Sequence, residues 1–80
     1  MTQKQFKGLV FGIPREIMPG ERRVAAIPDT VKKMVVGGAQ VLIEKGAGLK
    51  AYISDEDYIA AGAEIVEDSK TVYDRSNIIL

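Results

Sequence analysis

Apolar residues along this chain gather in short blocks, and the segments between the blocks are polar or of helical period. The first block, residues 9–13, is β-branched or aromatic at several positions and does not alternate between apolar and polar residues. This composition is typical of a parallel strand that is covered on both faces. The blocks predict four strands, at residues 9–13, 40–44, 63–66 and 77–80.

Helical signals fill the segments between these blocks. Pro28 suits the first turn of a helix, and Asp29 beside it favours the positive end of the helix dipole. Apolar residues then recur at helical spacing until the glycine pair at 37–38 ends the helix. Ser54 begins a capping-box pattern that predicts a short second helix, which closes at residues 60–62. Ser69 is predicted to cap a third helix.

Strands and helices therefore alternate with short connections, which predicts an α/β fold with a mainly parallel sheet. We expect a three-layer domain of the flavodoxin or Rossmann type. The final apolar block reads as the start of a buried strand, and the sequence stops inside it. Because domain termini usually lie in polar, exposed sequence, we expect residues 1–80 to be the N-terminal part of a domain that is incomplete here.

Composition narrows the range of functions. Eleven basic and eleven acidic residues cancel, so the charge excess expected of a nucleic-acid-binding protein is missing. The chain contains no histidine and no cysteine, which makes a zinc site very unfavourable and predicts no metal centre. The apolar runs are too short for a membrane span, and the N-terminus lacks the apolar core of a signal peptide. We expect a cytoplasmic location.

One glycine loop imitates a dinucleotide-binding motif. Gly46-Ala-Gly48-Leu-Lys-Ala51 fits G-x-G-x-x-A after a strand, and Glu67 or Asp68 lies about twenty residues further on. In a working motif, however, the glycines open the helix whose N-terminus faces the pyrophosphate. Here residues 49–53 intervene before the cap at Ser54. A purely structural loop is therefore the favoured interpretation, and nucleotide binding is the alternative.

The charged loop after the first strand is the main candidate for chemistry. It carries Arg15, Arg22 and Arg23, and the planar guanidinium group suits a carboxylate or a phosphate. Loops at the carboxyl ends of parallel strands are where ligands usually bind. Arg23 is the preferred substrate-binding candidate because it lies where the loop becomes apolar again. Arg15 and Arg22 reach solvent more easily, and local pairing on the surface is the alternative for all three arginines.

Two other groups of residues favour structural interpretations. The acidic run at residues 55–57 is better explained by helix capping than by metal binding. Tyr52, Tyr58 and Tyr73 are scattered, and each is expected to pack one ring face on the core. No combination of base and nucleophile is present, so we predict no catalytic residue and no complete active site in this chain.

Five segments together resemble a known family. They are Gly12-Ile-Pro-Arg-Glu, Glu21-Arg-Arg-Val-Ala-Ala, Gly38-Ala-Gln-Val-Leu-Ile-Glu-Lys-Gly-Ala-Gly48, Ser54-Asp-Glu-Asp-Tyr and Ala61-Gly-Ala-Glu-Ile-Val66. In order and spacing they are similar to the N-terminal domain shared by alanine dehydrogenases and the alpha subunits of proton-translocating NAD(P) transhydrogenases. Ile27 departs from both groups, in which a threonine usually precedes the proline and caps the helix.

The resemblance implies an oxidoreductase with two Rossmann-like domains and NAD bound mainly by the second, downstream domain. Residues 17–21 and 24–31 look more like the transhydrogenase branch. That branch implies hydride transfer from NADH to NADP+ on a partner subunit, with proton translocation. It also implies a homodimer, a membrane-embedded subunit and a position at the inner face of the membrane. Arg23 would then be structural or would line the cleft.

The alternatives are alanine dehydrogenase and a non-catalytic packing fragment. In the alanine dehydrogenase branch, the arginine that matches Arg23 holds the carboxylate of pyruvate or alanine. Its partner lysine is expected just beyond Leu80, and the catalytic histidine and aspartate lie further downstream. For either branch, the 80 residues alone are expected to be inactive.

Overall fold

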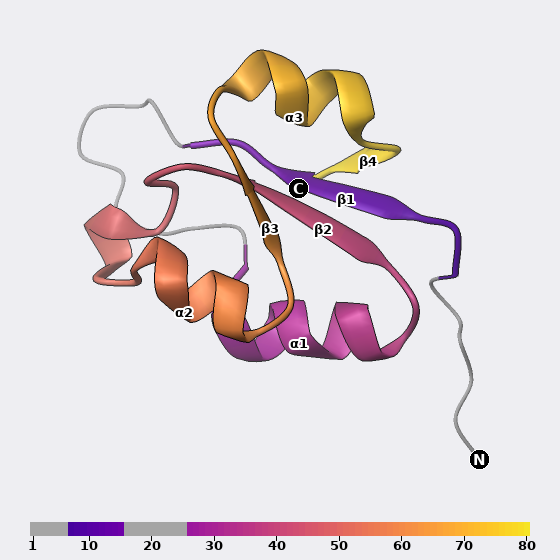
Figure 1. The fold of residues 1–80 in the computed structure, drawn as a ribbon, viewed down its shortest axis with the longest axis horizontal. Coiled ribbons are helices and arrows are strands. Elements are labelled where there is room, and N and C mark those ends of the chain that lie inside the picture. The colour runs from indigo at the N-terminus through magenta and orange to yellow at the C-terminus, as the bar shows by residue number, and fades with distance from the viewer. Residues whose placement is uncertain (1–6, 16–25) are drawn as a thin grey trace.

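The computed structural model describes residues 7–15 and 26–80, which form one parallel sheet with helices on both faces (Figure 1). The elements are β1 (Val10–Ile13), α1 (Pro28–Val36), β2 (Gln40–Glu44), the 3₁₀ helix η1 (Leu49–Ala51), α2 (Asp55–Ala60), β3 (Glu64–Val66), α3 (Ser69–Arg75) and β4 (Ile78–Ile79). The sheet has the order β3-β2-β1-β4, and every pairing is parallel. The predicted α/β class is therefore confirmed, with each of the four strands within one or two residues of its expected bounds.

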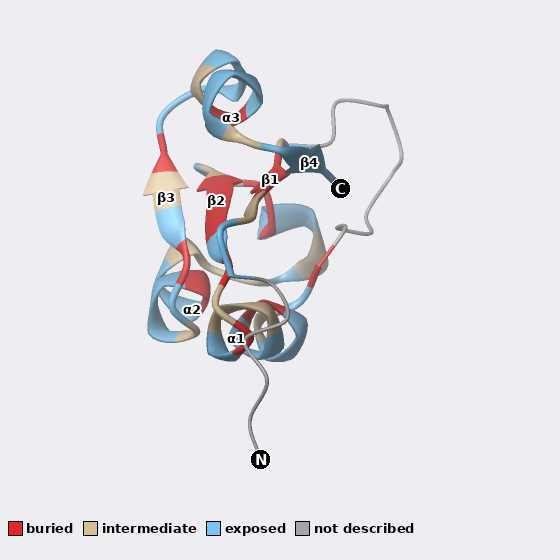
Figure 2. Ribbon diagram, turned by 90° about the vertical axis from the view of Figure 1, so that its right-hand side faces the viewer, coloured by how far each residue is buried: buried red, intermediate tan, exposed pale blue. Residues whose placement is uncertain are grey.

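The two faces of the sheet are covered differently. Helices α1 and α2 pack on one face and α3 packs on the other (Figures 1 and 2). Alternate strand residues divide between them: Phe11, Ile13, Val41 and Ile43 face α1 and α2, whereas Leu42 faces α3. Figure 2 shows buried positions, in red, along β1 and β2 at the centre of the sheet. In the described part of the chain, no helix is both long and apolar enough to cross a bilayer.

The helix termini mostly follow the sequence. Ser54 caps α2 through a complete capping box: Asp57 N donates to Ser54 Oγ, and Ser54 N donates to Asp57 Oδ2. The prediction for α3 was wrong by one residue, because Asp68 is the N-cap and accepts a hydrogen bond from Thr71 N at 2.8 Å. A carboxylate accepts from the free helix amides at least as well as a serine hydroxyl does.

Helix α1 begins without a side-chain cap. Its N-cap residue is Ile27, which has no side chain that could accept a hydrogen bond, and Pro28 occupies the first helical position. This agrees with the departure noted in the sequence. At the other end, Gly38 adopts a positive φ of 100°, and its amide donates to the Val35 carbonyl.

The last strand is less buried than predicted. Phe11 pairs with Ile78 and Gly12 with Ile79, so β4 lies at the edge of the sheet beside β1. Ile78, Ile79 and Leu80 keep 38–41% of their surface exposed. Among the described residues, β4 therefore pairs with β1 alone, at the edge of the sheet (Figure 1).

Candidate functional site at the carboxyl edge of the sheet

Parallel pairing brings the carboxyl ends of all four strands to one edge of the sheet. From β1 the chain moves outward to β2 and then to β3, and it then returns to place β4 on the other side of β1. The direction of winding therefore reverses between β1 and β4. Open α/β sheets bind their ligands in the crevice at such a reversal point. The segment that leaves β1 at Pro14 and Arg15 begins at this reversal point.

The structure places one of the three candidate arginines. Arg15 is exposed, as predicted, and its backbone amide donates to Glu44 Oε1 at 2.8 Å. Arg22 and the preferred candidate, Arg23, lie within residues 16–25, outside the described residues. Their proposed contact with a ligand therefore stays a prediction.

The glycine loop after β2 is filled by protein contacts. The Gly46 amide donates to Asp55 Oδ1 at 2.9 Å, so it is already engaged by a carboxylate. A Cβ added at Gly48 would lie 2.7 Å from Cε2 of Tyr58 and 2.9 Å from Cβ of Ile53. Gly48 is therefore needed for packing, and the space that a pyrophosphate would use at a fingerprint is closed. The loop does not fit a dinucleotide, which supports the structural interpretation.

A short helix does follow these glycines, although not one suited to a phosphate. Leu49–Ala51 forms the single 3₁₀ turn η1, and Tyr52 ends it at a positive φ of 62°. The Gly48 carbonyl accepts from the amides of Ala51 and Ile53, which closes the turn on itself. Since α2 begins only at Asp55, the predicted interruption between the glycines and the helix is present.

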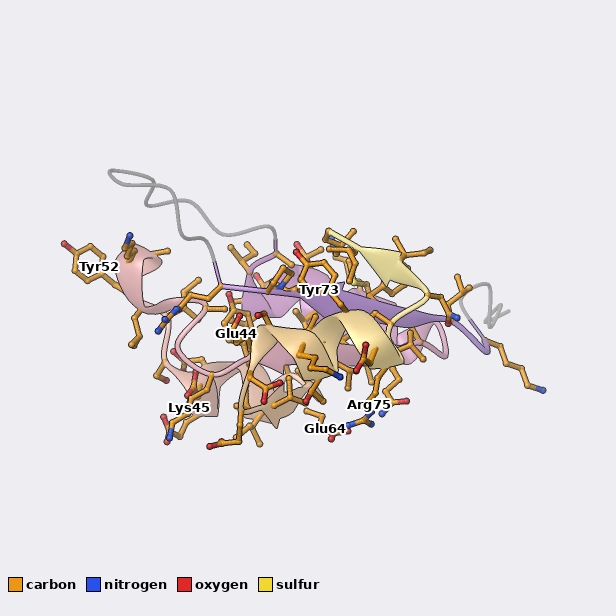
Figure 3. All side chains as sticks on the ribbon, turned by 90° about the horizontal axis from the view of Figure 1, so that it is seen from above. Glu44, Lys45, Tyr52, Glu64, Tyr73 and Arg75 are labelled. Atoms are coloured by element: carbon orange, nitrogen blue, oxygen red, sulfur yellow. The ribbon has the colours of Figure 1, made fainter. Side chains whose placement is uncertain are left out.

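The three tyrosines behave differently from one another. Tyr58 is completely buried, and its hydroxyl donates to the Ala26 carbonyl at 2.8 Å. Burial, and then the nearby charge of Asp55, raise the pKa of the Tyr58 hydroxyl. Tyr52 is 89% exposed, so the prediction that it packs a ring face on the core was wrong. Tyr73 is 56% exposed, and the packing of one of its ring faces stays a prediction. Figure 3 shows Tyr52 projecting from η1 at one end of the molecule.

The acidic run on α2 has two separate structural roles. Asp57 completes the capping box, whereas Asp55 reaches across to the glycine loop. Within the described residues, no three histidine, cysteine, aspartate or glutamate side chains come together as a metal site would require. The capping interpretation is therefore confirmed for Asp57 and was incomplete for Asp55.

Sequence reasoning missed that side chains of α2 and β2 support the carboxyl edge. From α2, Asp55 bonds to the loop after β2, and Tyr58 bonds to Ala26, two residues before α1. Glu44, at the end of β2, bonds to Arg15, two residues after β1. The spacing of Asp55 and Tyr58, three residues apart on one helix, was the available signal that they share a face.

A second polar cluster lies at the opposite, amino edge. The Arg75 guanidinium makes a two-point contact with Glu64, through Nη1 to Oε2 at 2.8 Å and Nη2 to Oε1 at 3.2 Å. Gln40 also donates to Glu64 Oε1. These hydrogen bonds lower the pKa of Glu64, and the bond from Arg75 has the largest effect. Figure 3 shows Glu64 and Arg75 side by side, where the pair ties α3 to β3.

The comparisons with known proteins agree with this arrangement. The family described as "Alanine dehydrogenase/PNT, N-terminal domain" matches residues 12–80. Alanine dehydrogenase from Methanococcus maripaludis is 47% identical over 72 residues, which are 90% of this chain and 19% of that protein. NAD(P) transhydrogenase subunit alpha from Cereibacter sphaeroides is 42% identical over 69 residues, 86% of this chain and 13% of that protein.

Solved structures from both groups share the fold. An L-alanine dehydrogenase superposes with a TM-score of 0.86 at 36% identity, covering 90% of this chain and 20% of that one. The transhydrogenase from Sinorhizobium meliloti superposes with a TM-score of 0.76 at 38% identity, covering 88% of this chain and 20% of that one. The chain thus spans about a fifth or less of the relatives that it matches. Because the family match extends over most of the sequence, and relatives of both groups align with it, this chain belongs to the alanine dehydrogenase/PNT N-terminal domain family.

Proposed function

We propose that this chain is the N-terminal part of an NAD(H)-linked oxidoreductase whose reaction cleft includes the crevice between β1 and β4. The observation that carries the proposal is the family match over residues 12–80, together with the charged loop that starts at the crevice. NAD is proposed to bind mainly to a downstream domain, because the glycine loop of this chain is closed by Asp55 and Tyr58.

Within the family, we favour the alpha subunit of a proton-translocating NAD(P) transhydrogenase. The support comes from residues 17–21 and 24–31, whose sequence looks like that branch. The subunit would hold NADH and pass hydride to NADP+ on a partner subunit. Its proposed setting is a cytoplasmic homodimer at the inner face of the membrane, attached through a membrane-embedded subunit. Arg23 would be structural or would line the cleft in this case.

The second candidate is alanine dehydrogenase, with reversible oxidative deamination of alanine to pyruvate and ammonia. It is favoured by the higher TM-score, 0.86 against 0.76, and by the 47% identity to the enzyme from Methanococcus maripaludis. Here Arg23 would bind the substrate carboxylate, because a guanidinium group offers two parallel donors that match the two carboxylate oxygens.

Turnover by the full-length protein separates the two candidates. NADH oxidation would be followed with pyruvate plus ammonium, and separately with an NADP+ analogue and the membrane partner. Turnover with pyruvate and ammonium contradicts the transhydrogenase proposal. Turnover only with the second nucleotide supports that proposal and removes the second candidate. Absence of turnover in both assays contradicts the proposed function as a whole.

Substitution of Arg23 tests its role in the second candidate. Removing a charge-assisted hydrogen bond to a carboxylate costs about 1.5–3 kcal/mol, so Arg23→Gln should raise the KM for pyruvate by roughly 10-fold or more. Arg15→Gln is the matched control, because Arg15 is exposed and its backbone contact with Glu44 survives the substitution. Equal effects of the two substitutions would remove Arg23 from the substrate site.

A further inference from the structure

The charged loop is bordered by two described residues, Arg15 and Ala26, and each is held by a side chain from another element. Arg15 follows β1 by two residues, and Ala26 precedes α1 by two residues. Arg15 is bonded through its amide to Glu44, and Ala26 through its carbonyl to Tyr58. Neither bond contributes to the regular hydrogen bonding of the sheet or of a helix.

The first contact extends the pairing of β1 with β2. Ile13 and Ile43 are the last paired residues of these strands. Beyond them, Oε1 of Glu44 accepts from the Arg15 amide at 2.8 Å, which is the length of a strong charge-assisted bond. The carboxylate thus takes the place of a backbone acceptor and fixes the direction in which the chain leaves β1.

The second contact fixes the chain just upstream of α1, a helix that has no side-chain cap. Ile27 offers no side-chain acceptor and Pro28 has no amide hydrogen, so local sequence does little to fix where the chain enters this helix. The Tyr58 hydroxyl instead donates to the Ala26 carbonyl at 2.8 Å, where both residues are buried. A buried carbonyl that lost this donor would remain unsatisfied, which is costly.

Helix α2 is itself held firmly enough to act as a support. Its N-terminus carries the complete capping box, and Asp55 bonds to the Gly46 amide. The ring of Tyr58 packs so closely over Gly48 that a Cβ there would lie 2.7 Å from Cε2. The hydroxyl of Tyr58 therefore has little freedom to move away from Ala26. Because burial and Asp55 raise its pKa, it stays protonated and able to donate at neutral pH.

We propose that Glu44 and Tyr58 are positioning residues, which hold Arg15 and Ala26 at the carboxyl edge of the sheet, on either side of the predicted charged loop. The proposal rests on the proposed function in one respect, namely that this loop lines the reaction cleft. Both residues act through Arg15 and Ala26 and neither is assigned a contact with substrate or cofactor. The two contacts fix Arg15 and Ala26, which are the described residues nearest to residues 16–25 on each side.

Hydrogen exchange in the full-length protein tests the contacts without an activity assay. Tyr58→Phe keeps the ring and removes the donor, and Glu44→Ala removes the acceptor. In peptides that cover residues 14–30, we expect exchange to be at least about fivefold faster in both variants. Tyr73→Phe is the matched control for Tyr58, because Tyr73 is exposed on α3. Glu44→Gln is the control for Glu44, since its amide oxygen can still accept from Arg15; both controls should exchange as the parent does.

Unchanged exchange at residues 14–30 in Tyr58→Phe and Glu44→Ala would overturn the proposal. Exchange that becomes faster across β1, β2 and α3 as well would also overturn it, because the residues would then only stabilise the domain. Glu44 is half-buried and lies near the surface, so Glu44→Ala keeps the test available if Tyr58→Phe does not fold.

Kinetics then connect the contacts to the cleft. In whichever assay gives turnover, Tyr58→Phe should raise the KM about three- to tenfold, for pyruvate in the first assay or for NADH in the second. The kcat should stay within about twofold of the parent value, because no reacting group has been removed. Faster exchange with an unchanged KM would overturn the link to the cleft. No turnover in the parent protein would contradict the proposed function. The exchange result would still show whether Glu44 and Tyr58 are positioning residues.

Discussion

The two faces of the sheet differ in how completely they are closed. On the face of α1 and α2, a continuous core includes Phe11, Ile13, Val41, Ile43 and the fully buried Tyr58. On the face of α3, the buried core of the described residues contains Leu42, Val66 and Val72. Since the hydrophobic contribution to stability grows with buried apolar area, the first face should supply most of the stability of this domain.

This difference explains where the candidate site obtains its support. Tyr58 and Asp55, which bond to Ala26 and to Gly46 at the carboxyl edge, both belong to α2 on the well-closed face. The α3 face instead depends on the close approach of α3 to β1 and on the surface pair of Glu64 with Arg75. The larger core lies under α1 and α2, and the smaller one lies under α3. An edge that is supported from the larger core can keep its geometry even when the face of α3 fluctuates.

The largest expected effect comes from truncating neighbouring residues of β2 that point to opposite faces. Ile43→Ala should lower the free energy of unfolding by about 4 kcal/mol, and Leu42→Ala by about 2–3 kcal/mol. Both side chains are fully buried, but Leu42 has fewer buried neighbours, so its site can collapse more easily. Urea unfolding of the two variants measures the difference, and equal losses would contradict the asymmetry between the faces.

Gly12→Ala should destabilise the packing of α3 on the sheet, because the added Cβ overpacks the contact. A Cβ at this position would overlap the Ser76 side chain and lie 2.7 Å from Cγ1 of Val72, so α3 would have to move away from β1. We expect a loss of about 1–3 kcal/mol in thermal or urea unfolding. Adding Ser76→Gly removes the overlapping atoms and should recover part of the loss. If the double variant is no more stable than Gly12→Ala, overpacking against Ser76 is not the cause.

Ile27→Thr should raise stability on the face of α1 and α2, because it supplies α1 with a side-chain cap. The Thr hydroxyl can accept from a free amide of the first turn, a contribution of about 1 kcal/mol. Ile27 is 50% exposed and has no cap bond to lose, so little burial is sacrificed. The melting temperature should rise by about 4–8 °C for a domain of this size. Ile27→Val, which has the same shape as threonine without the hydroxyl, should show no such rise.

The smallest effect is expected from the surface pair on the α3 face. The hydrogen bond from Arg75 lowers the pKa of Glu64 below its ordinary value of 4.5. A lowered folded-state pKa contributes stability that is present above the unfolded value and is lost as the pH falls through the folded value. Arg75→Met should therefore lower stability slightly at pH 7, and the difference from the parent should vanish below the folded pKa of Glu64. A difference that persists unchanged in acid would assign the effect to packing of the Arg75 stem.

The sequence by itself determined the secondary structure, the parallel sheet and the family. Continuous apolar blocks, the Pro28 start, the glycine pair at 37–38 and the capping box at Ser54 are local signals, and each acts through its own few residues. For the same reason the α3 cap was misplaced by only one residue, between Asp68 and Ser69. Arg23 could be singled out from the loop pattern and the resemblance, but it lies outside the described residues.

Only the tertiary structure decided what holds the carboxyl edge together. Three contacts join residues that are distant in sequence. Glu44 and Arg15 are 29 positions apart, Asp55 and Gly46 are 9 apart, and Tyr58 and Ala26 are 32 apart. From the sequence, the buried Tyr58 could not be distinguished from the exposed Tyr52 and Tyr73. Such contacts depend on the order in which the strands pair and on which face each helix covers. No local window of sequence contains that information, because it arises only when distant segments pack together.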